Sequence, residues 1–115
     1  MNEEDKIEDL PYMTGVINTM ARCDDLDFCY TKHCIERMKE REIIISDLLY
    51  VLKTGVVEEY QGLAKHHCQK IHKYKITGQS LYKERDISLI VLVEVNRLKN
   101  PAIKIQEIVT TMWKD

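Results

Sequence analysis

Three residues suited to phosphate chemistry stand at helical spacing in the segment YTKHCIERMKER, residues 30–41. His33, Arg37 and Arg41 occur at i, i+4 and i+8, so a helix would place them in one stripe. An imidazole titrates near neutral pH and can transfer protons, while a guanidinium can bind two phosphate oxygens at once. The pattern predicts a phosphate-directed site. The alternative is a helix edge whose Arg and His only cover apolar neighbours and pair with Glu.

A second group of candidates lies in the densest basic segment, AKHHCQKIHKYK, where lysines and histidines interleave without an acid. Such clusters attract phosphates and accelerate encounter with a polyanion, although single lysines at a strand edge also serve to block aggregation. In strand register His72 and Tyr74 would emerge on one face, where they could stack on or hydrogen-bond an unpaired base. The predicted RNA-binding residues are Lys65, His67, Lys70, Lys73, Tyr74 and Lys75.

The first functional hypothesis is a metal-independent ribonuclease that needs no cofactor. Cleavage by a 2′-hydroxyl requires a base, an acid and fixed cations around the phosphorane. His33 would transfer one proton, and His72, or failing that His67, would transfer the other. Arg37 and Arg41 would hold the non-bridging phosphate oxygens.

Two other hypotheses compete with the ribonuclease. The spacings of Cys29 with His33, and of His67 and Cys68 with His72, are ones that zinc ligands use, but no two cysteines stand close together. The other hypothesis is a non-catalytic module that binds nucleic acid or an acidic protein. Such a module would tolerate His33→Gln or His72→Gln, whereas acid–base catalysis would lose about two to four orders of magnitude.

Length and composition favour a single folded domain. A chain of 115 residues buries roughly two thirds of its unfolded surface, and its 31% charged and 44% hydrophobic residues are typical of globular proteins. No apolar run reaches transmembrane length and the acidic N-terminus is unlike a secretory signal, so we expect a cytoplasmic protein with reduced cysteines and no membrane partner. Residues 1–27 hold eight acids against two bases (net −6), and the remainder holds fifteen bases against eleven acids (net +4).

The order of elements predicts an α+β domain over residues 9–115, preceded by a disordered acidic lead of residues 1–8. Helices are expected at residues 10–22 and 30–41, the second capped by Thr31, and at 46–55 with Ser46 as N-cap and Gly55 as a left-handed C-cap. Strands are expected at residues 56–60, 70–76, 86–95 and 102–113, joined by turns that include 77–79 and 96–101. The apolar run DISLIVLVEV would be the central strand of a four-stranded antiparallel sheet, with the helices packed on one face.

The segment HCIERMKERE, followed by IIISDLLYVLKTGVVEEY, resembles the bacterial domain-of-unknown-function family four-two-five-eight. The later strands HKYKITG, LIVLVEV and IVTTMW are also similar to that family, and the resemblance covers about residues 28–113. Two features depart from the family pattern, namely Cys34 where an alanine is usual and the lysine-rich HHCQKIHK stretch. The matching positions are His33, Cys34, Arg37, Met38, Arg41, Ile45, Ser46, Gly55 and Tyr60.

Members of that family are similar to toxins of the RelE and MqsR type, which are small α+β endoribonucleases that cleave messenger RNA. The resemblance therefore implies a RelE/MqsR-like fold, an RNA substrate, free or on the ribosome, and a neutralising antitoxin protein as partner. Because one fold can host unrelated functions, the resemblance suggests an activity that the site itself must support.

Overall fold

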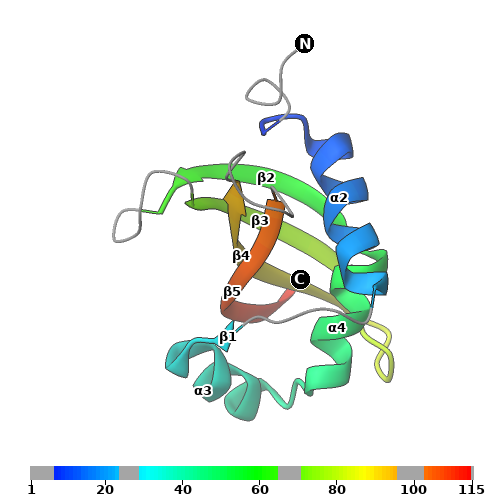
Figure 1. The fold of residues 1–115 in the computed structure, drawn as a ribbon. Helices are drawn as coiled ribbons and strands as arrows, with labels where there is room; N and C mark the ends of the chain where they lie inside the picture. The colour runs from blue at the N-terminus through cyan, green and yellow to red at the C-terminus, as the bar shows by residue number, and fades with distance from the viewer. Residues whose placement is uncertain (1–6, 24–28, 65–70, 96–102, 115) are drawn as a thin grey trace.

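The structure is a computed structural model that describes residues 7–23, 29–64, 71–95 and 103–114, apart from the side chains at positions 29, 104 and 106. In these residues three helices precede most of the strands, as the sequence predicts (Figure 1). In chain order the described elements are α2 (Leu10–Arg22), β1 (Cys29–Tyr30), α3 (Lys32–Arg41), α4 (Ile45–Thr54), β2 (Val56–Leu63), β3 (Ile71–Gln79), β4 (Asp86–Val95) and β5 (Ile103–Lys114).

The first helix, α2, has the predicted bounds. It begins where the Asp9 carboxylate accepts a hydrogen bond from Tyr12 N at 3.1 Å, which satisfies one of the unpaired N–H groups of the first turn. Met13, Ile17 and Ala21 follow at intervals of four and are buried. The spacing of these three residues therefore makes one apolar face, which packs on the rest of the fold.

The helix of the candidate stripe, α3, is capped as predicted. Thr31 Oγ1 accepts a hydrogen bond from Cys34 N at 2.9 Å and donates one to Val109 O at 2.6 Å, so the cap also ties the helix to β5. The helix is shorter than predicted at its start, because Tyr30 pairs in β1. It ends at Arg41, and the C-cap residue Glu42 has a left-handed backbone with φ 56°.

The start of α4 corrects the predicted cap. Ser46 is not the N-cap, because α4 already begins at Ile45 and Ile44 occupies the cap position. Ile44 has no side-chain acceptor, and the Asp47 carboxylate, 3.5 Å from Ile44 N, takes the reciprocal capping hydrogen bond instead.

Two glycines allow close packing at positions where the sequence predicts a helix C-cap and a turn. Gly55 was expected to be left-handed, but its backbone is extended, and a Cβ there would lie 2.5 Å from Val51 O and 2.7 Å from Thr77 O. The turn expected at residues 77–79 is also wrong, because β3 continues through them. A Cβ on Gly78 would lie 3.0 Å from Gly55 Cα, so both glycines let the end of α4 approach β3.

The sheet has the strand order β1-β5-β4-β3-β2. The four long strands pair antiparallel, which confirms the predicted α+β class, and β4 is the central strand, as its apolar run predicts. The fifth strand, β1, was not predicted. It pairs parallel to β5 through two residues, too few for a pattern of alternation to reveal.

The helices lie on one face of a strongly curved sheet (Figure 1). On this helix face Tyr74 and Ile76 of β3, with Leu89 and Val91 of β4, form part of the main core together with α2 and α4. A smaller cluster, which includes Ile71 of β3, uses residues outside the main core. None of the described helices is both long and apolar enough to cross a membrane.

The described chain begins close to the sheet. Ile7 and Glu8 form a turn, and the Ile7 carbonyl accepts a hydrogen bond from the Tyr74 hydroxyl at 2.8 Å. Ile7 and Glu8 are the last two residues of the predicted disordered lead, and residues 1–6 of that lead lie outside the described part of the chain.

Candidate functional site

The two members of the predicted stripe nearest the start of α3 lie together at the surface. His33 is exposed, and its Nε2 accepts a hydrogen bond from Arg37 Nε at 3.4 Å. Arg37 Nη1 also pairs with Glu40 at 2.9 Å, so the guanidinium is held between the imidazole and a carboxylate. This arrangement places a group that can transfer a proton beside a cation that can bind phosphate.

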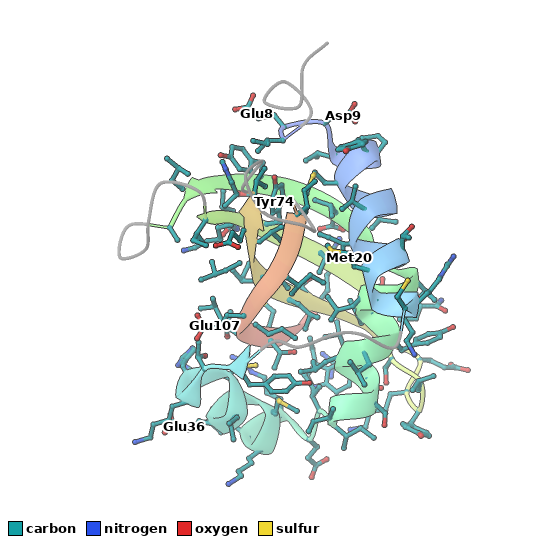
Figure 2. The ribbon with its side chains drawn as sticks, in the orientation of Figure 1. Glu8, Asp9, Met20, Glu36, Tyr74 and Glu107 are labelled. Atoms are coloured by element: carbon teal, nitrogen blue, oxygen red, sulfur yellow. The ribbon has the colours of Figure 1, made fainter. Side chains whose placement is uncertain are left out.

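The helix that carries this pair has a net positive charge. Its sequence, KHCIERMKER, contains four Lys or Arg residues and two Glu residues, a net of +2 with neutral His. Of its apolar residues, Cys34 and Met38 are buried and Ile35 is exposed, while Glu36 lies on the outer side of the helix (Figure 2). The helix therefore presents mostly charged side chains to solvent, as its amphipathic spacing predicts.

The third member of the stripe, Arg41, has a structural contact that the sequence did not predict. Its Nη1 donates a hydrogen bond to Thr111 O at 2.6 Å, and its own carbonyl accepts one from the Trp113 indole N–H at 2.9 Å. These bonds join the C-terminal end of α3 to β5. Arg41 thus fixes the helix that presents His33 and Arg37.

The candidate His72 lies in a different environment, inside the fold on β3. The residue is only 9% exposed, and its Nδ1 is 2.8 Å from the Tyr60 hydroxyl. Burial lowers the pKa of the His72 imidazole below its ordinary value, because the charged form loses hydration. His72 in this position is a neutral partner of Tyr60.

Tyr74 is fully buried, which contradicts its predicted role in stacking on RNA bases. The predicted register is correct, because His72 and Tyr74 do emerge on one face of β3, but that face is the helix face. The centroid of the Tyr74 ring lies 5.2 Å from that of the Tyr60 ring, and the Tyr74 hydroxyl donates its hydrogen bond to Ile7 O (Figure 2). Burial raises the pKa of the Tyr74 phenol well above its ordinary value.

The structure does not bring the two predicted proton-transfer residues, His33 and His72, into one site. His33 lies on α3, which packs against β5, whereas His72 lies on β3, and β4 stands between those two strands. Lys73 and Lys75 alternate with Tyr74 and so point to the opposite face of the sheet, where Lys75 Nζ is 4.0 Å from Glu58. The stripe on α3 and the basic strand are thus two separate regions.

The other predicted residues of the basic segment, Lys65, His67 and Lys70, lie outside the described residues, as does Cys68. In the described parts of the chain, no group of three or more His, Cys, Asp and Glu side chains is placed to hold a metal ion.

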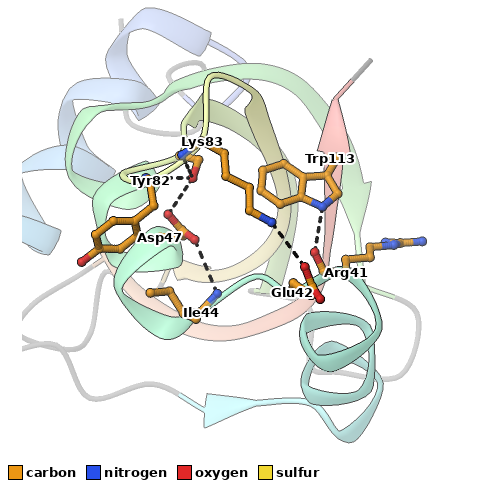
Figure 3. A network of polar contacts seen from close by, with 8 residues as sticks. Arg41, Glu42, Ile44, Asp47, Tyr82, Lys83 and Trp113 are labelled. Carbon is orange, nitrogen blue, oxygen red and sulfur yellow. Dashed lines mark hydrogen bonds and ion pairs between the residues drawn. The ribbon is translucent and has the colours of Figure 1, made fainter.

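Sequence reasoning missed a polar network around the loop between β3 and β4 (Figure 3). The buried carboxylate of Asp47 accepts hydrogen bonds from Ser80 Oγ at 2.9 Å and from Leu81 N at 2.8 Å. Further along the loop, Lys83 Nζ and the Arg85 guanidinium lie over the Trp113 ring, at 5.1 and 4.7 Å from its centroid. The loop, together with Lys114, lines an open cavity of about 660 Å³. No local pattern signals this network, because its members come from α4, the loop and β5.

A family model described as "Domain of unknown function (DUF4258)" matches residues 30–113 of this chain. The chain belongs to this family. The matched part of this DUF4258 protein includes the five described strands, except Cys29 of β1 and the last residue of β5. It also includes both His33 and Arg37. The helix α2 lies before the matched part. No curated protein matches this DUF4258 protein, and no solved structure matches it either.

Proposed function

We propose that this DUF4258 protein is a metal-independent endoribonuclease that cleaves single-stranded messenger RNA in the cytoplasm, as the toxin of a toxin–antitoxin pair. The observation that carries the proposal is the exposed imidazole of His33 in contact with the Arg37 guanidinium on a helix of net charge +2. The resemblance to RelE and MqsR toxins that we infer from the sequence would imply the same activity. A neutralising antitoxin protein would then be the cellular partner.

In the proposed reaction the RNA itself supplies the nucleophile. A base removes the proton of a 2′-hydroxyl, O2′ attacks the adjacent phosphorus, and the P–O5′ bond breaks as the leaving 5′-oxygen takes up a proton. The products are a 2′,3′-cyclic phosphate and a 5′-hydroxyl. Arg37 would stabilise the charge on the non-bridging oxygens, and no metal or protein-bound intermediate is needed.

His33 would carry out one of the two proton transfers. His72 is poorly placed for the other, because its ring is buried and bonded to Tyr60. His67, the second choice from sequence, lies outside the described residues and remains the candidate for that role.

A binding module is the second candidate function, and the burial of His72 favours it. With His72 withdrawn from solvent, the described residues expose one imidazole, that of His33, and acid–base cleavage uses two proton-transfer groups. The basic helix α3 would then dock a polyanion without cleaving it.

The deciding experiment is cleavage of a labelled single-stranded RNA in excess EDTA, with and without ribosomes. We expect cleavage by the wild-type protein and a loss of about two to four orders of magnitude in His33→Gln, because one proton transfer is removed. Arg37→Lys should also be impaired, since a lysine cannot bind two phosphate oxygens in a fixed plane. Lys39→Gln is the matched control, because it removes an exposed charge from the same helix and leaves the His33–Arg37 pair intact.

One result would contradict the nuclease itself, and two others would contradict the placement of its site at His33 and Arg37. They are RNA binding without cleavage by the wild-type protein, full activity of His33→Gln, and an equal loss in Lys39→Gln. The first would establish the binding module. The last would mean that α3 contributes only electrostatic attraction.

A further inference from the structure

Four of the seven large apolar side chains that are exposed among the described residues belong to two neighbouring segments. Ile44 and Ile45 at the start of α4 are 47% and 52% exposed, and Leu81 and Tyr82 in the loop between β3 and β4 are 44% and 71% exposed. The two pairs are neighbours, because the Asp47 carboxylate bonds both Ile44 N, at 3.5 Å, and Leu81 N, at 2.8 Å. We call these four residues the apolar patch.

Buried hydrogen bonds hold the loop half of the patch in place. Asp47 is only 3% exposed, and besides Leu81 N it accepts a hydrogen bond from Ser80 Oγ. The Ser80 hydroxyl in turn accepts hydrogen bonds from Tyr82 N and Lys83 N, each at 3.2 Å (Figure 3). The loop is therefore ordered before any partner arrives, which lowers the entropic cost of binding.

A preformed apolar patch of this kind is typical of a surface that binds another protein. Exposed apolar residues scattered singly need no explanation, but contiguous ones rimmed by charged residues mark interaction sites. The exposed charged residues that directly follow α3 or the patch in the sequence are Glu42, Lys83, Glu84 and Arg85, and we take these four as its rim.

The charges of the rim indicate which kind of partner fits. Its two acids and two bases sum to zero, and Lys83 Nζ is already 3.6 Å from Glu42. A rim of only positively charged residues would attract nucleic acid, but these four positions carry both signs. A rim that carries both signs can be complementary to itself when a two-fold rotation brings a base of one copy opposite an acid of the other.

We propose that the apolar patch is the interface of a homodimer with two-fold symmetry. Ile44, Ile45, Leu81 and Tyr82 of one copy pack against the same residues of the second copy, and the charged rim sets the orientation. His33 lies at the other end of α3, roughly 12 Å along the helix from Arg41 at a rise of 1.5 Å per residue. The dimer thus leaves both copies of the candidate site accessible to RNA.

The test is sedimentation equilibrium of the full chain over a range of concentrations. The wild-type protein is expected to be dimeric, and Ile45→Asp is expected to weaken self-association by roughly 30-fold or more, as for a charged substitution at an interface hot spot. An acid in the first turn suits a helix, so this variant should fold. Leu63→Asp is the matched control, because Leu63 is also 52% exposed but lies on β2. It should leave the dimer unchanged.

Circular dichroism checks that each variant is folded, and Tyr82→Ser provides a second substitution within the patch. A wild-type protein that is monomeric throughout, or a patch variant that dimerises normally, would overturn the proposal. Equal weakening by Leu63→Asp would do the same. A monomer whose affinity for single-stranded RNA falls in Tyr82→Ser would instead assign the patch to nucleic acid.

Discussion

At the scale of single residues, burial separates two histidines that look alike in the sequence. His33 is exposed beside Arg37, whereas His72 is buried beside Tyr60. An exposed imidazole can meet a substrate and exchange protons with it. A buried one is more stable when neutral, so its protonation is coupled to unfolding.

This coupling predicts that acid destabilises the protein through His72. Burial lowers the pKa of His72 from its ordinary value of 6.5, so between the two pKa values the unfolded chain binds more protons than the folded one. The free energy of unfolding should therefore fall as the pH decreases below 6.5, by at most about 1.4 kcal/mol per pH unit from this residue. Urea unfolding of the wild-type protein and of His72→Gln at neutral and mildly acidic pH measures the effect, which the substitution should reduce.

His33→Gln is the matched control, because it removes an exposed ring. If His72→Gln and His33→Gln lose stability with acid as steeply as the wild-type protein, the assignment of the effect to His72 is wrong.

At the scale of elements, Gly55 directly after α4 and Gly15 within α2 have opposite roles. Gly55 lets the end of α4 approach β3, and an added Cβ would clash with Val51 O and Thr77 O. Gly15 lies inside α2, where a Cβ would meet no atom within 4 Å. The first glycine is required by packing, while the second only weakens its helix.

Alanine at these two positions should therefore change stability in opposite directions. Gly55→Ala is expected to lower the free energy of unfolding by about 1–3 kcal/mol, as overpacking of a tight contact does. Gly15→Ala is expected to raise it by about 0.5–1 kcal/mol, because alanine restricts the unfolded chain and favours the helix. Urea titrations followed by circular dichroism compare the two variants. A stabilised Gly55→Ala variant would show that α4 and β3 are not in close contact.

Most element types follow from local patterns, and most errors occur where elements meet. The periodicity of α2 and the Thr31 cap of α3 predict these helices closely. The cap of α4 was misassigned because Ser46 suits the position locally, although Asp47 provides the acceptor in the fold. The prediction of a turn at residues 77–79 is wrong for a similar reason. Gly78 lies within β3, where the lack of a side chain lets the end of α4 come close.

At the scale of the whole molecule, the helix before the matched family region is part of the core. Met13 and Ile17 of α2 are fully buried. The Asn18 amide donates hydrogen bonds to Leu52 O at 2.7 Å and to Gly55 O at 3.2 Å, which joins α2 to the end of α4. Removal of α2 would expose this part of the helix face to water.

We therefore expect a fragment of residues 30–115 to lack a cooperative fold, although it spans the whole family match. Loss of a core helix removes buried apolar area that a domain of this size needs for stability. Urea unfolding and binding of a hydrophobic dye test this, with the full chain as reference. A fragment that unfolds cooperatively at the same urea concentration would show that α2 is dispensable.

The sequence by itself determined the α+β class, the helices, the central position of β4 and the pairing of His33 with Arg37 on α3. These features depend on periodicity and spacing within one segment, which the backbone geometry of a helix or strand converts directly into position. The tertiary structure alone decided that Tyr74 and His72 face the core, that Arg41 ties α3 to β5, and that the apolar patch forms. Alternation along a strand shows which residues share a face, but only the packing of other elements determines which face is buried.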